Sequence, residues 1–145
     1  MRKWRQRVGR AGAFTLVELM IVVTIVAILA LIAIPLYSAN TTAAIMSEGV
    51  AGTGTIRTAL RNYYAQNSTY AGATLPTSSA SGTLTLAWAD LQGKYFASGD
   101  YSLVSVTAST YTIKAGPPSQ TIRTGMPYYQ IDQNGSEQGT YYSNQ

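Results

Sequence analysis

The sequence predicts an α+β fold in which one long N-terminal helix packs against an antiparallel β-sheet. Two patterns lead to this prediction. An apolar run near the N-terminus is followed by apolar residues at helical spacing, and later segments rich in Tyr, Thr, Val and Ile alternate with a period of two. The length of 145 residues fits one domain with additional segments.

The first segment, residues 1–13, is strongly basic. Five of the ten Lys and Arg residues lie before position 11, without any acidic residue among them. From Phe14 onward five basic residues stand against six acidic ones, a formal charge of −1. Positive residues beside a membrane span remain in the cytoplasm, so this segment is a topological signal. It brings no folded basic face, and no nucleic-acid partner is expected.

The second segment, residues 14–36, is predicted to span a membrane. The run "LMIVVTIVAILALIAI" at residues 19–34 has Thr24 as its only polar side chain, and about 20 largely apolar residues suffice to cross a bilayer. Glu18 stands at the start of this run, where a charge costs on the order of 2.5–3.5 kcal/mol and therefore indicates a function. The alternative is that its side chain snorkels from the edge of the span to the headgroups.

Small residues before the run indicate where the chain is cut. An ordinary signal-peptidase site after the run fits poorly, because "YSA" at residues 37–39 places bulky Tyr37 where a small residue is required. Ala11, Gly12 and Ala13 lie on the other side of the run. A cut there would remove the basic leader and keep the anchor.

The segment "AFTLVELMIVVTIVAILALIAIP", residues 13–35, resembles the N-terminal signature of type IV pilins and of type II secretion pseudopilins. The resemblance implies that prepilin peptidase, a membrane aspartyl protease, cuts between Ala13 and Phe14 and then methylates the α-amine of Phe14. The usual residue before the cut is Gly. Ala13 is nearly as small, so cleavage is still expected.

The resemblance also implies a role for Glu18 in assembly. The α-amine of Phe14 in one subunit and Glu18 of a neighbour would neutralise each other in the filament core. Breaking a buried pair of this kind costs about 3–5 kcal/mol, so pairing would favour one axial register between subunits. Phe14 and Glu18 are one helical turn apart, which leaves an intramolecular pair as the alternative.

The helix is expected to continue beyond the membrane. Pro35 removes a helical hydrogen bond and predicts a bend or a locally melted segment at residues 31–37; the alternative is that Pro35 ends the membrane helix. Residues 37–66 are predicted to form an amphipathic half-helix that docks on the globular part. Its docking stripe would consist of Ile45, Gly49, Gly52, Ile56, Leu60 and Tyr63.

The last segment, residues 67–145, is predicted to form a loop and an antiparallel sheet. Asn67 and Ser68 offer a helix stop, and turn-forming residues indicate a surface loop at 68–82. Asn134-Gly135 predicts a hairpin that pairs residues 128–133 with 136–142, and the prolines at 115–121 indicate a connecting loop. The expected strands are residues 83–88, 101–106, 111–115 and 128–132.

The chain contains neither Cys nor His, which excludes thiol chemistry, disulfides and the commonest zinc ligands. Many pilins close their C-terminal region with a disulfide, so the last hairpin or an ion would take that role here. Pseudopilins use calcium in this region, and Asp132, Asn134 and Glu137 are candidate ligands. Their spacing differs from the EF-hand loop, and a plain Asn-Gly turn explains them more simply. No cofactor is expected.

The function implied by the resemblance is that of a structural filament subunit. Its partners would be copies of itself, other pilins, prepilin peptidase, the inner-membrane assembly platform and, before assembly, membrane lipid. The leader would lie in the cytoplasm and the C-terminal part in the periplasm. A pseudopilin of type II secretion is the main alternative, favoured by the short chain and the lack of Cys.

Three other functions have less support in the sequence. A minor pilin that binds DNA or surfaces would need a basic groove, and the remaining Lys and Arg residues are scattered. Electron transport along the eleven tyrosines competes with their ordinary use in strands and interfaces. Enzymatic activity needs a positioned pair of titratable groups, and the acidic residues of the globular part, Asp90, Asp100, Asp132 and Glu137, lie in no recognisable motif.

Overall fold

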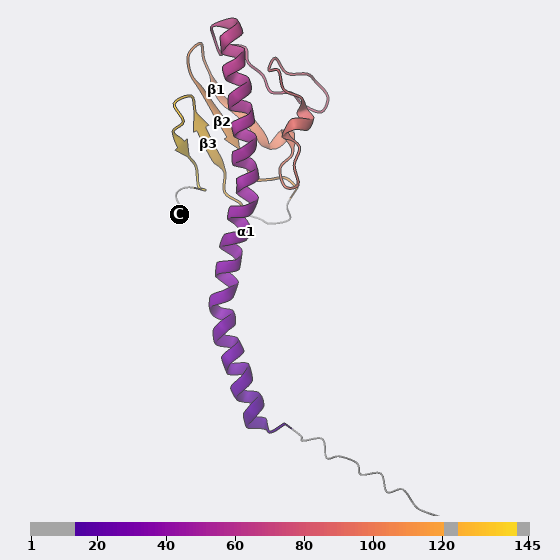
Figure 1. The fold of residues 1–145 in the computed structure, drawn as a ribbon, viewed down its shortest axis with the longest axis vertical. Coiled ribbons are helices and arrows are strands. Elements are labelled where there is room, and N and C mark those ends of the chain that lie inside the picture. Colours follow the sequence, from indigo (N-terminus) through magenta and orange to yellow (C-terminus); the bar gives the residue numbers. More distant parts are fainter. Residues whose placement is uncertain (1–13, 121–124, 142–145) are drawn as a thin grey trace, which may run out of the picture. The chain divides into compact units, whose positions relative to one another are not determined.

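The computed structural model describes residues 14–120 and 125–141 (Figure 1). It has the predicted α+β architecture of one long helix and a four-stranded antiparallel sheet in the order β1-β2-β3-β4. The elements are α1 (Leu16–Asn67), two short 3₁₀ helices η1 (Trp88–Leu91) and η2 (Ser98–Asp100), and strands β1 (Tyr101–Val106), β2 (Tyr111–Ala115), β3 (Tyr129–Asp132) and β4 (Glu137–Gln138).

The chain divides into two compact units, Met1–Ala39 and Asn40–Gln145. In the described part of the first unit, α1 is helical without interruption and Pro35 lies inside it. The expected melted segment at residues 31–37 is therefore wrong, and so is the alternative that the helix ends at Pro35. A proline removes one hydrogen bond of the ladder, and the bonds on either side suffice to continue the helix. A bend at Pro35 stays a prediction.

In the second unit, α1 packs with one face on the sheet and its connecting loops (Figure 1). The predicted stripe is confirmed at Ile45, Gly49, Ile56 and Leu60, which are buried, while Gly52 and Tyr63 are half-buried. The buried face is wider than the predicted stripe, because a core-facing helix buries a broad sector of its circumference. It also includes Met46, Thr53 and Ala59.

Two glycines of this face allow the close approach that the sequence predicted. A Cβ atom on Gly49 would lie 2.6 Å from Cζ of Phe96, whose ring is fully buried. A Cβ atom on Gly52 would overlap the phenol of Tyr101. Glycine costs roughly 1 kcal/mol in a helix, so close packing against these rings is the physical reason for its presence here.

The sheet matches the predicted strands in three of four places. Strands β1 and β2 have the predicted bounds, and β3 begins one residue later than expected. The strand predicted at residues 83–88 is absent from the described structure. Instead, the backbone N–H of Thr83 donates to the carbonyl and to Oγ1 of Thr74, and the backbone N–H of Thr74 donates to Oγ1 of Thr83. Such side-chain bonds compete with a strand ladder. Apolar and polar residues alternate in this segment because Leu84 is buried in the core, although the described segment pairs with no strand.

The predicted turns are confirmed. Helix α1 ends at Asn67, followed by Ser68 in the left-handed region with φ 55°. The predicted hairpin at Asn134-Gly135 is present, but its register is shifted by one residue. Ile131 lies opposite Glu137 and Asp132 bonds Ser136, so the loop has three residues in place of the two of a plain Asn-Gly turn. Strand β4 is shorter than predicted because Gly139, at φ 125°, breaks the extended conformation.

Residues 40–145 are expected to fold without the apolar half of α1. The buried face of α1 and all four strands lie in this part of the chain, so its hydrophobic core stays complete. Circular dichroism of a fragment starting at Asn40 should show a cooperative thermal transition, and sedimentation should show a monomer. An unfolded or aggregated fragment would mean that the domain boundary lies elsewhere.

Candidate assembly site at the start of α1

The first turn of α1 is closed by a reciprocal pair of hydrogen bonds. Thr15 Oγ1 accepts a hydrogen bond from the backbone N–H of Glu18 at 3.2 Å. Glu18 Oε2 accepts hydrogen bonds from the backbone N–H and the hydroxyl of Thr15, both at 2.9 Å. This arrangement is a capping box, which satisfies N–H groups that the helix leaves without partners. It fixes the Glu18 carboxylate at the helix start.

The sequence predicted a role for Glu18 but none for Thr15. The signal was present, because Thr followed three positions later by Glu at the start of an apolar run is the pattern of a capping box. The Glu18 carboxylate has a second oxygen, Oε1, which accepts no hydrogen bond from the residues that the structure describes. A carboxylate offers about four lone-pair sites, so this oxygen remains available to a cation.

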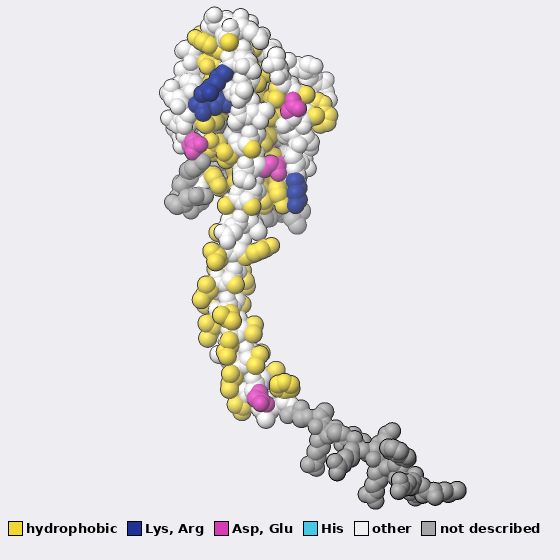
Figure 2. Space-filling model, in the orientation of Figure 1, with side chains coloured by type: hydrophobic (Ala, Val, Ile, Leu, Met, Phe, Trp, Pro, Cys, Tyr) yellow, Lys and Arg dark blue, Asp and Glu magenta, His cyan; other side chains and the backbone are white. Residues whose placement is uncertain are grey.

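Around this turn the apolar side chains are exposed. Phe14 has 85% of its surface exposed, and every large hydrophobic residue from Leu16 to Leu36 is more than half exposed. Figure 2 shows hydrophobic side chains along the visible face of this part of the helix. By length and composition α1 can cross a membrane. An exposed apolar surface of this extent requires lipid or other helices around it.

The other predicted site residues lie elsewhere or outside the described residues. Phe14 lies two residues before α1 begins, and Glu18 is in the first turn of α1. Ala13 lies outside the described residues, and Pro35 is in the interior of α1. The residue that would carry the new α-amine and the glutamate thus lie four positions apart at the start of the helix.

The calcium candidates form the hairpin turn rather than a ligand set. Asp132 Oδ1 accepts hydrogen bonds from the backbone N–H groups of Asn134 at 2.9 Å and Ser136 at 2.8 Å. Glu137 Oε1 accepts a hydrogen bond from the Tyr129 hydroxyl at 3.0 Å on the neighbouring strand. Among the described residues, no group of three or more acidic, His or Cys side chains is arranged to hold a metal ion.

Glu48 has a structural role that was not predicted from the sequence. Its Oε1 accepts hydrogen bonds from the backbone N–H groups of Phe96 at 2.8 Å and Tyr95 at 3.0 Å. The carboxylate thus ties α1 to the segment before η2. Burial, together with the nearby carboxylates of Glu48 and Asp100, raises the pKa of Tyr101 to about 12. The phenol is therefore neutral at physiological pH.

Two further carboxylates of the unit Asn40–Gln145, called the head from here on, also hold backbone turns. Asp90 Oδ2 accepts the N–H of Ala87 at 2.9 Å. Asp100 Oδ2 accepts the N–H of Ala97 at 2.8 Å, and it also accepts the backbone N–H and the hydroxyl of Ser119. These contacts resemble helix caps. They give these two carboxylates a structural role.

The fold and the N-terminal turn together define a class of protein: a small α+β head that carries a membrane-length apolar helix with a capped, acidic start. Residues 9–34 match the prokaryotic N-terminal methylation motif, which is the signature of type IV pilins and pseudopilins. The chain thus carries this signature on a pilin-like α+β arrangement. Searches of curated proteins and of solved structures found no match.

Proposed function

We propose that the chain is a structural subunit of a type IV pilus, polymerised through α1 after removal of the leader. The observation that supports this most directly is the methylation motif at residues 9–34, which continues into an apolar helix surface that the chain itself leaves exposed. Helices of neighbouring subunits would cover this surface. Head-to-tail contacts between identical subunits generate open filaments when the rotation does not close a ring.

In this proposal the N-terminal turn acts as a recognition site between subunits. Thr15 holds the carboxylate of Glu18 by one oxygen, and the second oxygen receives the methylated α-amine of Phe14 from a neighbouring subunit. In a core that excludes water the two charges attract strongly, and either charge alone is costly. A subunit that joins the filament in a different axial register would leave both charges unpaired.

Before assembly the subunit would be held in the bacterial inner membrane by α1, with the leader in the cytoplasm and the head in the periplasm. This orientation follows from the basic residues of the leader. The proposed partners are prepilin peptidase, the assembly platform of the same membrane, and further pilins.

The second candidate is a pseudopilin of type II secretion, because the same motif is the signature of both classes. The two are distinguished by the phenotype of a deletion strain that is complemented with this chain. Restored surface filaments in a sheared-cell fraction indicate a pilus. Restored release of a secreted reporter enzyme, without long surface filaments, indicates a pseudopilus.

Processing is expected between Ala13 and Phe14. Intact mass and N-terminal sequencing of the mature protein should show a chain that begins with N-methylated Phe14. Ala13→Gly should be cleaved at least as fast, since it restores the usual residue, whereas Ala13→Leu should stay uncut because its side chain is bulky. A mature terminus at Asn40, or an uncut leader in cells with active prepilin peptidase, would contradict this prediction.

A further inference from the structure

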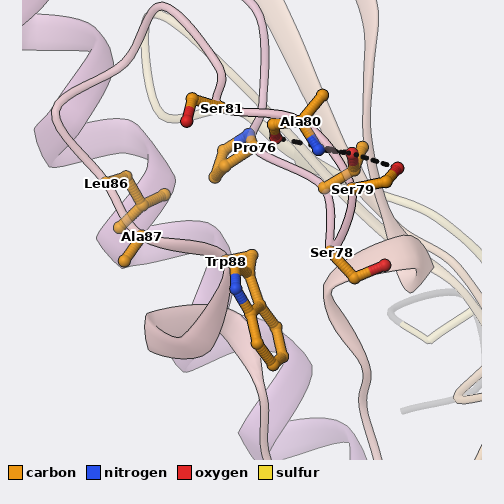
Figure 3. A pocket seen from close by; sticks show the side chains of 9 residues that line it. Pro76, Ser78, Ser79, Ala80, Ser81, Leu86, Ala87 and Trp88 are labelled. Carbon is orange, nitrogen blue, oxygen red and sulfur yellow. Dashed lines mark hydrogen bonds between the residues drawn. The ribbon is translucent and has the colours of Figure 1, made fainter.

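The head contains a hollow that the proposed assembly function does not use. Its volume is about 340 Å³, and its walls are formed by residues 76–81 and 86–88 (Figure 3). This volume lies in the range of sites for small molecules. None of the lining residues carries a charge, and four of them bear hydroxyl groups: Thr77, Ser78, Ser79 and Ser81.

The hydroxyl-rich wall is a loop that is tied by its own hydrogen bonds. The N–H of Thr77 donates to the carbonyl of Ala80 at 2.8 Å, and the N–H of Ala80 donates to Thr77 Oγ1 at 3.0 Å. At its base, Thr74 and Thr83 exchange bonds between backbone N–H and side-chain oxygen, at 2.8 and 3.0 Å. The wall is therefore organised before any ligand arrives, which lowers the entropic cost of binding.

The opposite wall is formed by Leu86, Ala87 and Trp88 (Figure 3). Trp88 is 44% exposed, although its neighbours Leu84 and Leu91 are buried in the core. The turn that carries it is fixed by the bond from the N–H of Ala87 to Asp90. Tryptophan is highly buried on average. An exposed indole on a hydrogen-bonded turn beside a hollow is thus available to a ligand.

We propose that this hollow binds a neutral carbohydrate. A sugar ring combines hydroxyl groups, which pair with serine and threonine hydroxyls, and a face of C–H groups, which packs on the electron-rich face of an indole. Within the described residues, the hydroxyls of Ser78 and Ser81 and the Trp88 indole N–H make no hydrogen bond to the protein. The uncharged lining does not match phosphate or nucleic acid, which require cationic contacts.

The binding test uses the full chain in a zwitterionic detergent without a sugar headgroup. Trp4 and Trp88 are the only tryptophans, so Trp4→Phe leaves Trp88 as the sole indole reporter. Titration with methyl glycosides of neutral hexoses and N-acetylhexosamines, and with their short oligomers, should change Trp88 fluorescence in a saturable way. The site is read out on the unassembled chain, so the result is independent of the proposed function.

Variants assign the binding to this hollow. By saturation-transfer NMR, Trp88→Ala should weaken the binding of the best glycoside by about tenfold or more, equal to about 1.4 kcal/mol. Ser78→Ala combined with Ser81→Ala should weaken it severalfold. Val104→Ala, which also trims an exposed apolar residue, should bind as the parent does. Circular dichroism confirms that each variant is folded.

Three results would overturn the proposal. The first is that no glycoside of the panel gives a saturable change. The second is unchanged binding by a folded Trp88→Ala variant. The third is that a proline-rich peptide or a DNA oligonucleotide, tested under the same conditions, competes with the glycoside or binds in its place.

Discussion

Glu18→Leu is expected to abolish filament assembly while leaving membrane insertion and leader cleavage intact. Insertion should survive because leucine makes the span more apolar and the basic leader still orients it. Cleavage should survive because the protease is expected to recognise Ala13 and Phe14. Assembly should fail because the α-amine of Phe14 would lack its counter-charge in a core of low dielectric constant, at about 3–5 kcal/mol per subunit.

Each step has its own measurement: membrane fractionation for insertion, gel mobility for cleavage, and the sheared-filament yield or secretion of a reporter for assembly. Glu18→Gln is the matched control, because glutamine still accepts the hydrogen bonds of Thr15 but carries no charge. It should also fail to assemble if the charge is what matters. Normal filament yield from Glu18→Leu as the only subunit would favour the alternative that Glu18 snorkels at the membrane edge.

Gly49→Leu is expected to destabilise the head by on the order of 3 kcal/mol, the upper part of the range for overpacking. The added side chain has no space, because even its Cβ atom would lie 2.6 Å from the fully buried ring of Phe96. Thermal and denaturant unfolding of the fragment that starts at Asn40 measures the effect. A loss of this size lowers the melting temperature by roughly 10 °C or more in a domain of about 100 residues.

Gly54→Leu provides the internal control, because it makes the same substitution in the same helix. A Cβ atom on Gly54 meets no other atom within 4 Å, so only the helix propensity changes. The variant should be more stable than the parent by up to about 1 kcal/mol. Equal destabilisation by both substitutions would contradict this explanation, because the contact with Phe96 is specific to Gly49.

Local patterns predicted most of the fold, because the elements involved are specified by neighbours in the sequence. The stripe on α1, strands β1 and β2 and the Asn134-Gly135 hairpin each follow from the spacing of side chains or from turn chemistry. The segment at residues 83–88 shows where this reasoning fails. Its alternation is that of a strand, but bonds to Thr74, nine residues away, determine its conformation.

Among the candidate sites, too, some follow from local sequence patterns and others depend on contacts between distant residues. A functional role for Glu18 could be predicted because a charged residue next to an apolar run is visible in a short stretch of sequence. The role of Glu48 could not, since its partners Tyr95 and Phe96 are 47 and 48 residues away in the sequence. The hollow beside Trp88 also depends on packing, because it forms only when the loop at residues 76–81 lies against the turn of η1.

The capping box has a consequence for the maturation of the chain. Both members, Thr15 and Glu18, lie on the C-terminal side of the predicted cut, and the amide N–H of Thr15 is still an amide after the bond between Ala13 and Phe14 is broken. Among the described residues, the hydrogen bonds that cap the helix start come from Thr15 and Glu18 themselves. Cleavage of the leader would therefore leave the first turn of α1 unchanged. It would create a charged N-terminus next to a helix start that already has its final conformation.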